Sequence, residues 1–188
     1  MRFRNHLLLF GLLAVAPACQ LQQNGGAEGT PARSTSWGVG TQHALISLGY
    51  SETDNEVSNV ETDRLEFEGE YGFLLNDNLE VNGAFQVGHR DTNGTDTTNL
   101  GGFGGLRYYL LTPTDRTPSA FYGEARAGFL VIDSGARDET EPAVNLGAGF
   151  IWWPLGLSEH IALDFSADFI AADDYQRLGL FLGMGFWF

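Results

Sequence analysis

Apolar and polar residues alternate along most of the chain after residue 36, and the alternation is clearest at its end. From Leu178 to Phe188 every second residue is large and apolar, and the positions between them are mostly glycine. Successive side chains of a β-strand point to opposite faces, so this segment predicts a strand with one continuous apolar face. Such a strand is an aggregation hazard in water. In a closed membrane barrel, however, the apolar face contacts lipid and both strand edges are paired.

The same alternation divides residues 37–188 into eight predicted strands. They are expected at 37–50, 62–74, 79–90, 98–111, 120–132, 142–154, 160–171 and 176–188. The cluster Asn76-Asp77-Asn78 and the prolines at positions 113, 118, 142 and 154 fall between the predicted strands or at their ends, where turn chemistry belongs. The chain is therefore predicted to be all-β, an eight-stranded antiparallel up-and-down transmembrane β-barrel.

Charged residues share one face of the predicted strands. A charge that faces the bilayer midplane costs roughly 2–4 kcal/mol, so this face is expected to point into the barrel. An eight-stranded barrel is just wide enough to be filled by side chains, which favours a lumen plugged by arginine–carboxylate pairs. The expected members of this network are Glu66, Glu68, Glu70, Glu80, Arg107, Glu124, Arg126, Asp164 and Asp168, with His43 beside them. Because acids outnumber arginines and small residues such as Gly179 and Gly183 leave room for water, a narrow cation-preferring channel is the alternative.

The N-terminal segment has the features of an export signal. Residues 1–18 combine two arginines, a short apolar run from Leu7 to Val15 and small residues at the end, which predicts a signal peptide. Cys19 follows directly and resembles the lipidated cysteine of lipoproteins, so it is a candidate for lipidation; ordinary cleavage without lipid is the alternative. Residues 19–36 are rich in Gln, Gly and Ser and predict a flexible tether before the barrel, residues 37–188.

Charge and loop chemistry set the expected orientation. The net charge of −14 argues against nucleic acid as a partner. The connections after the first, third, fifth and seventh predicted strands are acidic and longer than the others, which predicts acidic loops outside the cell and both barrel termini in the periplasm. Near that outer rim we expect contacts of arginines with lipopolysaccharide phosphates and of carboxylates with shared divalent cations. The four arginines concerned are Arg64, Arg90, Arg137 and Arg177.

Two further expectations concern aromatic residues and catalysis. Amphipathic rings favour membrane interfaces, so the aromatics near the periplasmic strand ends are expected in an interfacial belt that includes Tyr109, Tyr122, Trp153 and Trp187. No His, Ser and acid constellation of the kind used by membrane hydrolases stands at one membrane face, so no enzymatic activity is expected. No dedicated calcium-loop spacing occurs either, and no cofactor or resident metal is expected.

The barrel segment resembles a known family. The opening strand through Leu48-Gly49-Tyr50-Ser51 and the glycine-rich run from Gly101 to Tyr109 are similar to small eight-stranded barrels typified by the transmembrane domain of outer-membrane protein A. The alternating end with Phe186 and Phe188 resembles the C-terminal signature of outer-membrane barrels, which implies recognition by the barrel-assembly machinery. The resemblance implies the architecture of an outer-membrane barrel, and together with the features above we expect a monomeric, non-enzymatic barrel in the bacterial outer membrane with a structural or surface-interaction role. A lipocalin-like ligand-binding barrel tethered by Cys19 is the remaining alternative.

Overall fold

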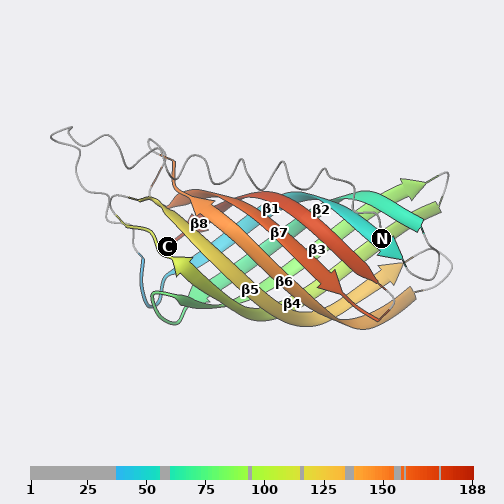
Figure 1. The fold of residues 1–188 in the computed structure, drawn as a ribbon, viewed down its shortest axis with the longest axis horizontal. Coiled ribbons are helices and arrows are strands. Elements are labelled where there is room, and N and C mark those ends of the chain that lie inside the picture. Colours follow the sequence, from blue (N-terminus) through green and yellow to red (C-terminus); the bar gives the residue numbers. More distant parts are fainter. Residues whose placement is uncertain are drawn as a thin grey trace. The chain divides into compact units, whose positions relative to one another are not determined.

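The structure is a computed structural model that describes residues 37–55, 60–92, 95–114, 117–133, 138–154, 158, 160–173 and 175–188. Its strands are β1 (Gln42–Asn55), β2 (Val60–Leu74), β3 (Leu79–Thr92), β4 (Thr95–Leu111), β5 (Ser119–Asp133), β6 (Asp138–Trp152), β7 (Ile161–Ala171) and β8 (Gln176–Trp187). Each strand pairs antiparallel with its sequence neighbours, and β1 pairs with β8 to close the barrel (Figure 1). The predicted fold class is confirmed. No helix long and apolar enough to cross a membrane occurs in the described part of the chain.

The closure between β1 and β8 explains how the apolar C-terminal strand is accommodated. The two strands pair continuously from His43 opposite Trp187 to Asp54 opposite Gln176. The backbone of Gln42 also exchanges hydrogen bonds of 2.8 and 2.9 Å with the last residue, Phe188. The C-terminal strand therefore has a partner on each edge, β7 on one side and β1 on the other.

The strand bounds differ from the predicted ones at both ends of the barrel. β1 begins at Gln42, because Gly40 has a left-handed φ of 91° and the backbone of Thr41 turns back to bond Gly38. At the other end the acidic segments are not loops but paired strand extensions, with Asp54 opposite Glu61 and residues 91 and 96 facing each other. The prediction that connections at this end are the longer ones was wrong, since pairing leaves only residues 56–59, 93–94, 134–137 and 172–175 between strands.

The two ends of the barrel are called the acidic end and the terminal end. The acidic end carries the four short connections just given. The terminal end carries Trp37–Thr41, Phe188 and the connections 75–78, 112–118 and 153–160.

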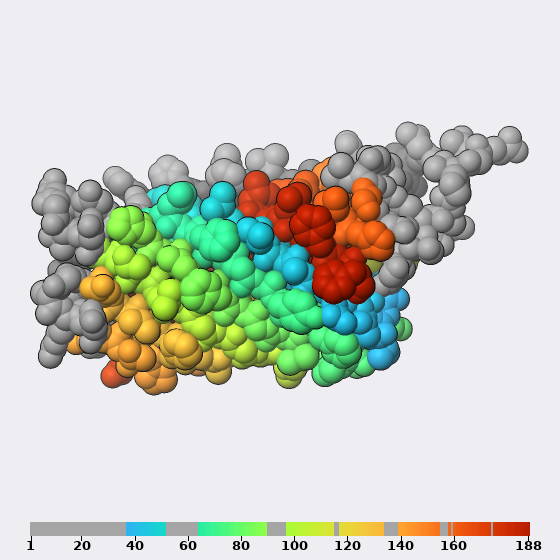
Figure 2. Space-filling view, turned by 180° about the vertical axis from the view of Figure 1, so that it is seen from behind, coloured from blue at the N-terminus to red at the C-terminus, as the bar shows by residue number. Residues whose placement is uncertain are grey.

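Burial alternates along the strands and separates two surfaces. In β8, Leu180, Leu182, Met184 and Phe186 are exposed, whereas the residues between them are buried. Neighbouring strands repeat the pattern, and their outward side chains form the continuous outer surface in Figure 2. The exposed large apolar residues of the strands include Ile46, Leu48, Leu65, Phe67, Tyr71, Val81, Phe85, Leu106, Phe129, Val144, Leu146 and Phe165. A lipocalin-like barrel needs the reverse arrangement, with an apolar interior, so that alternative is not supported.

Candidate functional site in the barrel interior

The barrel interior holds a continuous group of charged side chains drawn from seven strands, β1–β5, β7 and β8. Alternation dictates their common direction, because residues 66, 68 and 70 of β2 share a parity and so do 164 and 168 of β7. The structure brings all nine residues of the expected network together, and each of them contacts another member directly or through one further side chain. Their side chains are almost completely shielded from solvent.

The centre of the network is two arginines that share two glutamates. Arg107 donates from Nη2 to Glu70 at 2.8 Å and to Glu124 at 2.7 Å, and its Nε lies 2.9 Å from Glu124. Arg126 bonds the same two carboxylates, with a distance of 2.8 Å to Glu124. Asn82 links Arg126 to Glu124. Its amide oxygen accepts a hydrogen bond from Arg126, and its amide nitrogen donates one to Glu124 at 3.3 Å. Removing one partner from such a desolvated cluster leaves an uncompensated charge, which typically costs about 3–5 kcal/mol.

A branch toward the terminal end contains His43 and Glu80. His43 Nε2 lies 2.8 Å from Glu70, and its Nδ1 lies 3.2 Å from Glu80. Tyr109 donates its hydroxyl to Glu80 at 2.7 Å. The nearest ligand-type atoms of His43, Glu70 and Glu80 all lie within 4.8 Å of one another, the spacing of a metal site. Arg107 already lies 2.8 Å from Glu70 and 3.6 Å from Glu80, so this cluster is an ion-pair network whose cation is a guanidinium.

A second branch runs toward the acidic end. Arg177 pairs with Glu66 and with Asp168, and Glu66 also accepts the hydroxyl of Ser51 at 2.7 Å. Asp168 accepts from Asn145 at 2.9 Å and from Gln86 at 3.2 Å. Gln86 also bonds Glu68, the third carboxylate near Arg126. Glu66, Glu68 and Asp168 are thereby joined to the central cluster through Arg126.

The structure corrects the expected positions of two arginines. Arg64 and Arg177 were predicted at the outer rim, in contact with lipopolysaccharide phosphates, but their side chains are buried inside the barrel with exposed fractions of 7% and 3%. The reason is parity, since Arg64 shares a face with Glu66 and Arg177 shares one with Gly179 and Phe181. The side chain of Arg90 and all of Arg137 lie outside the described residues, so their predicted role stays a prediction.

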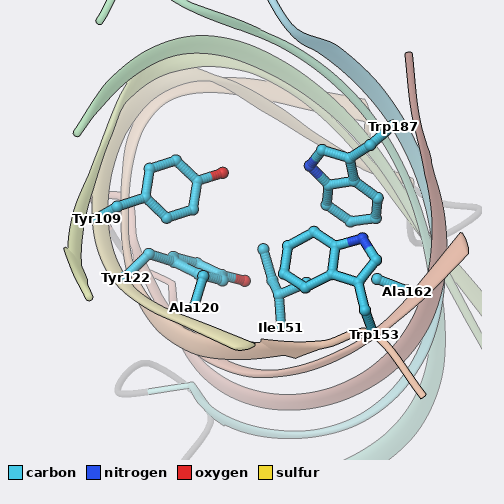
Figure 3. Close-up of a cluster of buried hydrophobic side chains, with 7 residues drawn as sticks. All are labelled: Tyr109, Ala120, Tyr122, Ile151, Trp153, Ala162 and Trp187. Carbon is cyan, nitrogen blue, oxygen red and sulfur yellow. The ribbon is translucent and has the colours of Figure 1, made fainter. Parts of the chain in front are cut away.

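An aromatic cluster fills the terminal end of the lumen (Figure 3). Trp153 and Trp187 meet edge to face with ring centroids 5.2 Å apart, and Tyr109 and Tyr122 do so at 6.0 Å. Trp37 lies against this cluster, 4.7 Å from Tyr109 between ring centroids. The prediction that Tyr109, Tyr122, Trp153 and Trp187 line a membrane interface was wrong, because their parity directs them inward.

This cluster connects to the charged network through Tyr122. Its ring stacks under the guanidinium of Arg107, with 3.9 Å from the carbon to the ring centroid. Its hydroxyl donates to the carboxylate of Asp164, with oxygen–oxygen distances of 3.0 and 3.2 Å. His43 stacks on Trp187 in the same way, with centroids 5.1 Å apart and an interplanar angle of 17°. The rings and the charges therefore form one packed unit.

A second apolar cluster lies on the other side of the charged network, toward the acidic end. Phe103, Leu130, Ala143, Ile170 and Tyr175 are buried together there. Most of the charged residues thus lie between two layers of apolar side chains.

The interior glycines do not leave open space. Phe181 covers the Cα positions of Gly49 and Gly179, and Trp187 covers Gly185. The side chain of Ser47 occupies the position that a Cβ of Gly183 would take. The expectation that these glycines leave room for water was wrong, because aromatic and polar side chains of the same or a neighbouring strand lie over them.

The numbers of basic and acidic groups inside the barrel are also closer to each other than expected. Arg64 and Arg177 join Arg107 and Arg126 inside the barrel, and His43 adds a fifth basic group. They face seven carboxylates: Glu66, Glu68, Glu70, Glu80, Glu124, Asp164 and Asp168. The sequence interpretation missed the inward position of Arg64, Arg177 and the four interior aromatic residues. The alternation of side chains along each strand could have predicted it.

The remaining predicted residues fall elsewhere. Phe186 and Phe188 are exposed on the outer surface at the terminal end. Cys19, the signal peptide and the tether lie outside the described residues.

Comparison with known proteins identifies the class of fold. No family model matches the chain, and no curated protein matches it. Among solved structures, the attachment invasion locus protein Ail of Yersinia pestis aligns with 80% of this chain and 99% of its own, at 19% identity and a TM-score of 0.57. Neisserial surface protein A aligns with 79% and 99%, at 13% identity and a TM-score of 0.64. The N-terminal barrel domain of Pseudomonas aeruginosa OprF aligns with 80% and 99%, at 20% identity and a TM-score of 0.51.

These similarities define the fold. The chain has the architecture of the small eight-stranded barrels of bacterial outer membranes, as its sequence resemblance implied.

Proposed function

We propose that the chain is a monomeric outer-membrane barrel without enzymatic activity, closed to ions, whose role is structural or to present its acidic end at the cell surface. The observation that carries this proposal is the combination of an apolar exterior with an interior occupied by packed aromatic and ion-paired side chains. The first half supports membrane insertion, and the second supports a closed lumen.

The exterior supports insertion because its central band carries no charge. The outward residues from Ala44 to Tyr50 in β1, Leu65 to Phe73 in β2 and Leu178 to Phe186 in β8 are all apolar, glycine or tyrosine. The strands have 11 to 17 residues, and about 9–11 tilted residues suffice to cross the hydrocarbon core. We therefore place the protein in the bacterial outer membrane. An envelope fractionation in which the full chain is released by alkaline washing would contradict this placement.

The interior supports closure because two kinds of barrier follow one another along the axis. The Trp153–Trp187 contact and its neighbours form an apolar layer at the terminal end. Behind it, Arg107 and Arg126 are each held by shared carboxylates. An ion that crossed the barrel would have to displace both, and separating buried ion pairs costs several kcal/mol.

Planar-bilayer recording tests closure directly. The full chain is refolded in detergent, its folded state is verified by heat-modifiable electrophoretic mobility, and the same sample is added to the bilayer. We expect no conductance steps in the folded sample. Reproducible ohmic steps would overturn closure and favour the second candidate, the narrow cation-preferring channel.

That second candidate is favoured by one observation, the excess of interior carboxylates over guanidinium groups. A channel lined by this excess prefers cations. Its reversal potential in a salt gradient would have the sign of cation selectivity, and Glu68→Gln would weaken that selectivity. Glu68 suits the test because it is the carboxylate least tightly paired with Arg126. Its oxygen lies 3.4 Å from Arg126, whereas that of Glu124 lies 2.8 Å away.

The acidic end is the proposed interaction surface. Asp133, Glu139 and Asp173 are exposed there, and oxygen ligands of this kind suit divalent cations shared with lipopolysaccharide phosphates. We expect Mg²⁺ to raise the thermal stability of the barrel more in lipopolysaccharide-containing membranes than in phospholipid alone. Equal shifts in both membranes would contradict a shared site.

Assembly and processing are proposed from the two chain ends. Deleting Phe188 is expected to reduce insertion in cells through the barrel-assembly machinery while leaving refolding in detergent intact. Mass spectrometry of the mature protein decides between lipidation at Cys19 and cleavage of residues 1–18 without lipid.

A further inference from the structure

Arg64 is a buried arginine with no ionic partner among the residues that the structure describes. Its side chain lies inside the barrel near the acidic end, and 93% of its surface is shielded, since the exposed fraction is 7%. Two of its three guanidinium nitrogens, Nε and Nη1, are shut off from solvent and have no hydrogen-bond partner among the described residues. Arginine cannot lose its charge in a protein, so it cannot escape this situation by deprotonation.

The nearby carboxylate does not supply the missing partner. Glu66 lies beside Arg64, because both side chains pass over Gly88. One oxygen of Glu66 accepts from Ser51 at 2.7 Å, and the other pairs with Arg177. No carboxylate oxygen of a described residue lies within ion-pair distance of Arg64, in contrast to Arg107, Arg126 and Arg177.

The surroundings of Arg64 supply a second unsatisfied group. The Arg64 guanidinium carbon lies 5.8 Å from the centroid of the Tyr175 ring. The hydroxyl of that ring accepts a 2.8 Å hydrogen bond from the amide nitrogen of Asn99. The other end of this amide, Oδ1, is buried and has no hydrogen-bond partner in the part of the chain that the structure describes. Gly88, which Arg64 crosses, pairs with Asn99 across the β3–β4 ladder, so the two orphaned groups belong to one small region.

From this geometry we propose that Arg64, Asn99 and Tyr175 form a binding subsite for a small oxyanion that carries a hydroxyl group, such as a sugar acid. The guanidinium supplies charge-assisted donors to the anion. The free end of the Asn99 amide accepts a hydrogen bond from the hydroxyl, and the Tyr175 ring forms an apolar wall. The net charge of −14 disfavours long polyanions, so the ligand is a small anion.

The arrangement differs from a structural ion pair in a measurable way. A buried arginine that only balances the field of distant carboxylates is not expected to bind an added anion. In a binding subsite, binding of the anion saturates as its concentration rises. The bound anion then forms hydrogen bonds with the Arg64 and Asn99 atoms that have no partner among the described residues.

Calorimetric titration of the full chain, refolded in detergent micelles, tests the proposal. The probe is glucuronate, with acetate as an anion lacking hydroxyls and glucose as a hydroxylated molecule lacking charge. We expect saturable binding of glucuronate, weaker binding of acetate and none of glucose. Arg64→Met, which keeps length and removes charge, is expected to weaken glucuronate binding about tenfold or more. Asn99→Leu is expected to weaken glucuronate and leave acetate unchanged.

Thr98→Ala is the matched control, because Thr98 lies beside Asn99 on the opposite face of β4. It is expected to bind glucuronate like the unmodified chain. A second readout needs no variant: the ¹⁵N resonance of Arg64 Nε is expected to shift on titration with glucuronate and not with glucose. Absence of saturable binding to the unmodified chain, or equal binding by Arg64→Met, overturns the proposal.

Discussion

Arg177 of β8 forms an ion pair with Glu66 of β2 across the full width of β1, the strand that separates them. The pair spans the junction where the first and last strands close the barrel, and Ser51 of β1 donates a hydrogen bond to the same glutamate. Three strands at the closing seam are thereby linked on the interior side. The backbone ladder joins β1 to β8, and this pair reinforces the same closure through side chains.

A double-mutant cycle measures that reinforcement. Arg177→Met and Glu66→Gln are each expected to destabilise the barrel, because each leaves a buried opposite charge with fewer partners. The double variant is expected to lose less than the sum of the two, with a coupling energy of roughly 0.5–3 kcal/mol. Urea unfolding in detergent, monitored by tryptophan fluorescence, provides the four stabilities. Additive losses would show that the pair contributes nothing specific to the seam.

A second prediction concerns Glu70, which three basic groups share. His43, Arg107 and Arg126 all contact its carboxylate. Glu70→Gln removes the charge that stabilises them and is expected to cost about 3–5 kcal/mol in the same unfolding assay. Asp173→Asn, at an exposed position between β7 and β8, is the control and is expected to change stability by less than about 0.5 kcal/mol. Similar effects of both substitutions would contradict the central role of Glu70.

The fold was predictable because alternation is a local property of the sequence. Leu178 to Phe188 identifies a strand with an apolar outer face without knowledge of its neighbours, and the same rule assigned Glu66, Glu68 and Glu70 to the interior. Arg64 and Arg177 show what happens when position along a strand is considered before parity. They stand near strand ends, which suggested the rim, yet the alternation that placed Glu66 also places them inside.

Other features depend on contacts between distant residues, which the sequence does not display. The pairing of Arg177 with Glu66 joins residues 111 positions apart, and the register that makes it possible is set by the closure of β1 on β8. The strand extensions that end at Asn55 and Asp133 also need pairing partners, and acidic sequence alone favoured loops there. The alternation and hydropathy of the residues therefore predict which side chains face outward and which face inward. The ion pairs inside the barrel depend in addition on how the strands pair.

A third prediction uses two glycines that differ only in their surroundings. A Cβ added to Gly128 of β5 would overlap the carbonyl oxygen of Gly102 on β4, whereas one added to Gly69 of β2 meets nothing within 4 Å. Gly128→Ala therefore requires the backbone of two strands to move and is expected to cost about 1–3 kcal/mol. Gly69→Ala is expected to be neutral or to stabilise by up to about 1 kcal/mol, since it restricts the unfolded chain.

The comparison has an internal control, because both substitutions add the same methyl group to a strand of the same barrel. Urea unfolding of the two variants beside the unmodified chain gives the result. Equal stabilities for Gly128→Ala and Gly69→Ala would show that β4 and β5 do not approach each other as closely as the structure has them.

The last prediction tests the apolar exterior residue by residue. Leu182 lies on the outer face of β8, paired with Leu48 of β1 and Phe165 of β7, in the middle of the apolar band. Leu182→Arg places a charge there and is expected to cost roughly 2–4 kcal/mol in lipid bilayers. Leu110→Arg, at the terminal end of β4, is expected to cost at most about 1 kcal/mol, because near the interface the charge reaches water. Unfolding is measured for both variants in phospholipid vesicles. If Leu182→Arg were as stable as Leu110→Arg, the band around Leu182 would not be immersed in hydrocarbon, and the membrane assignment would lose its main support.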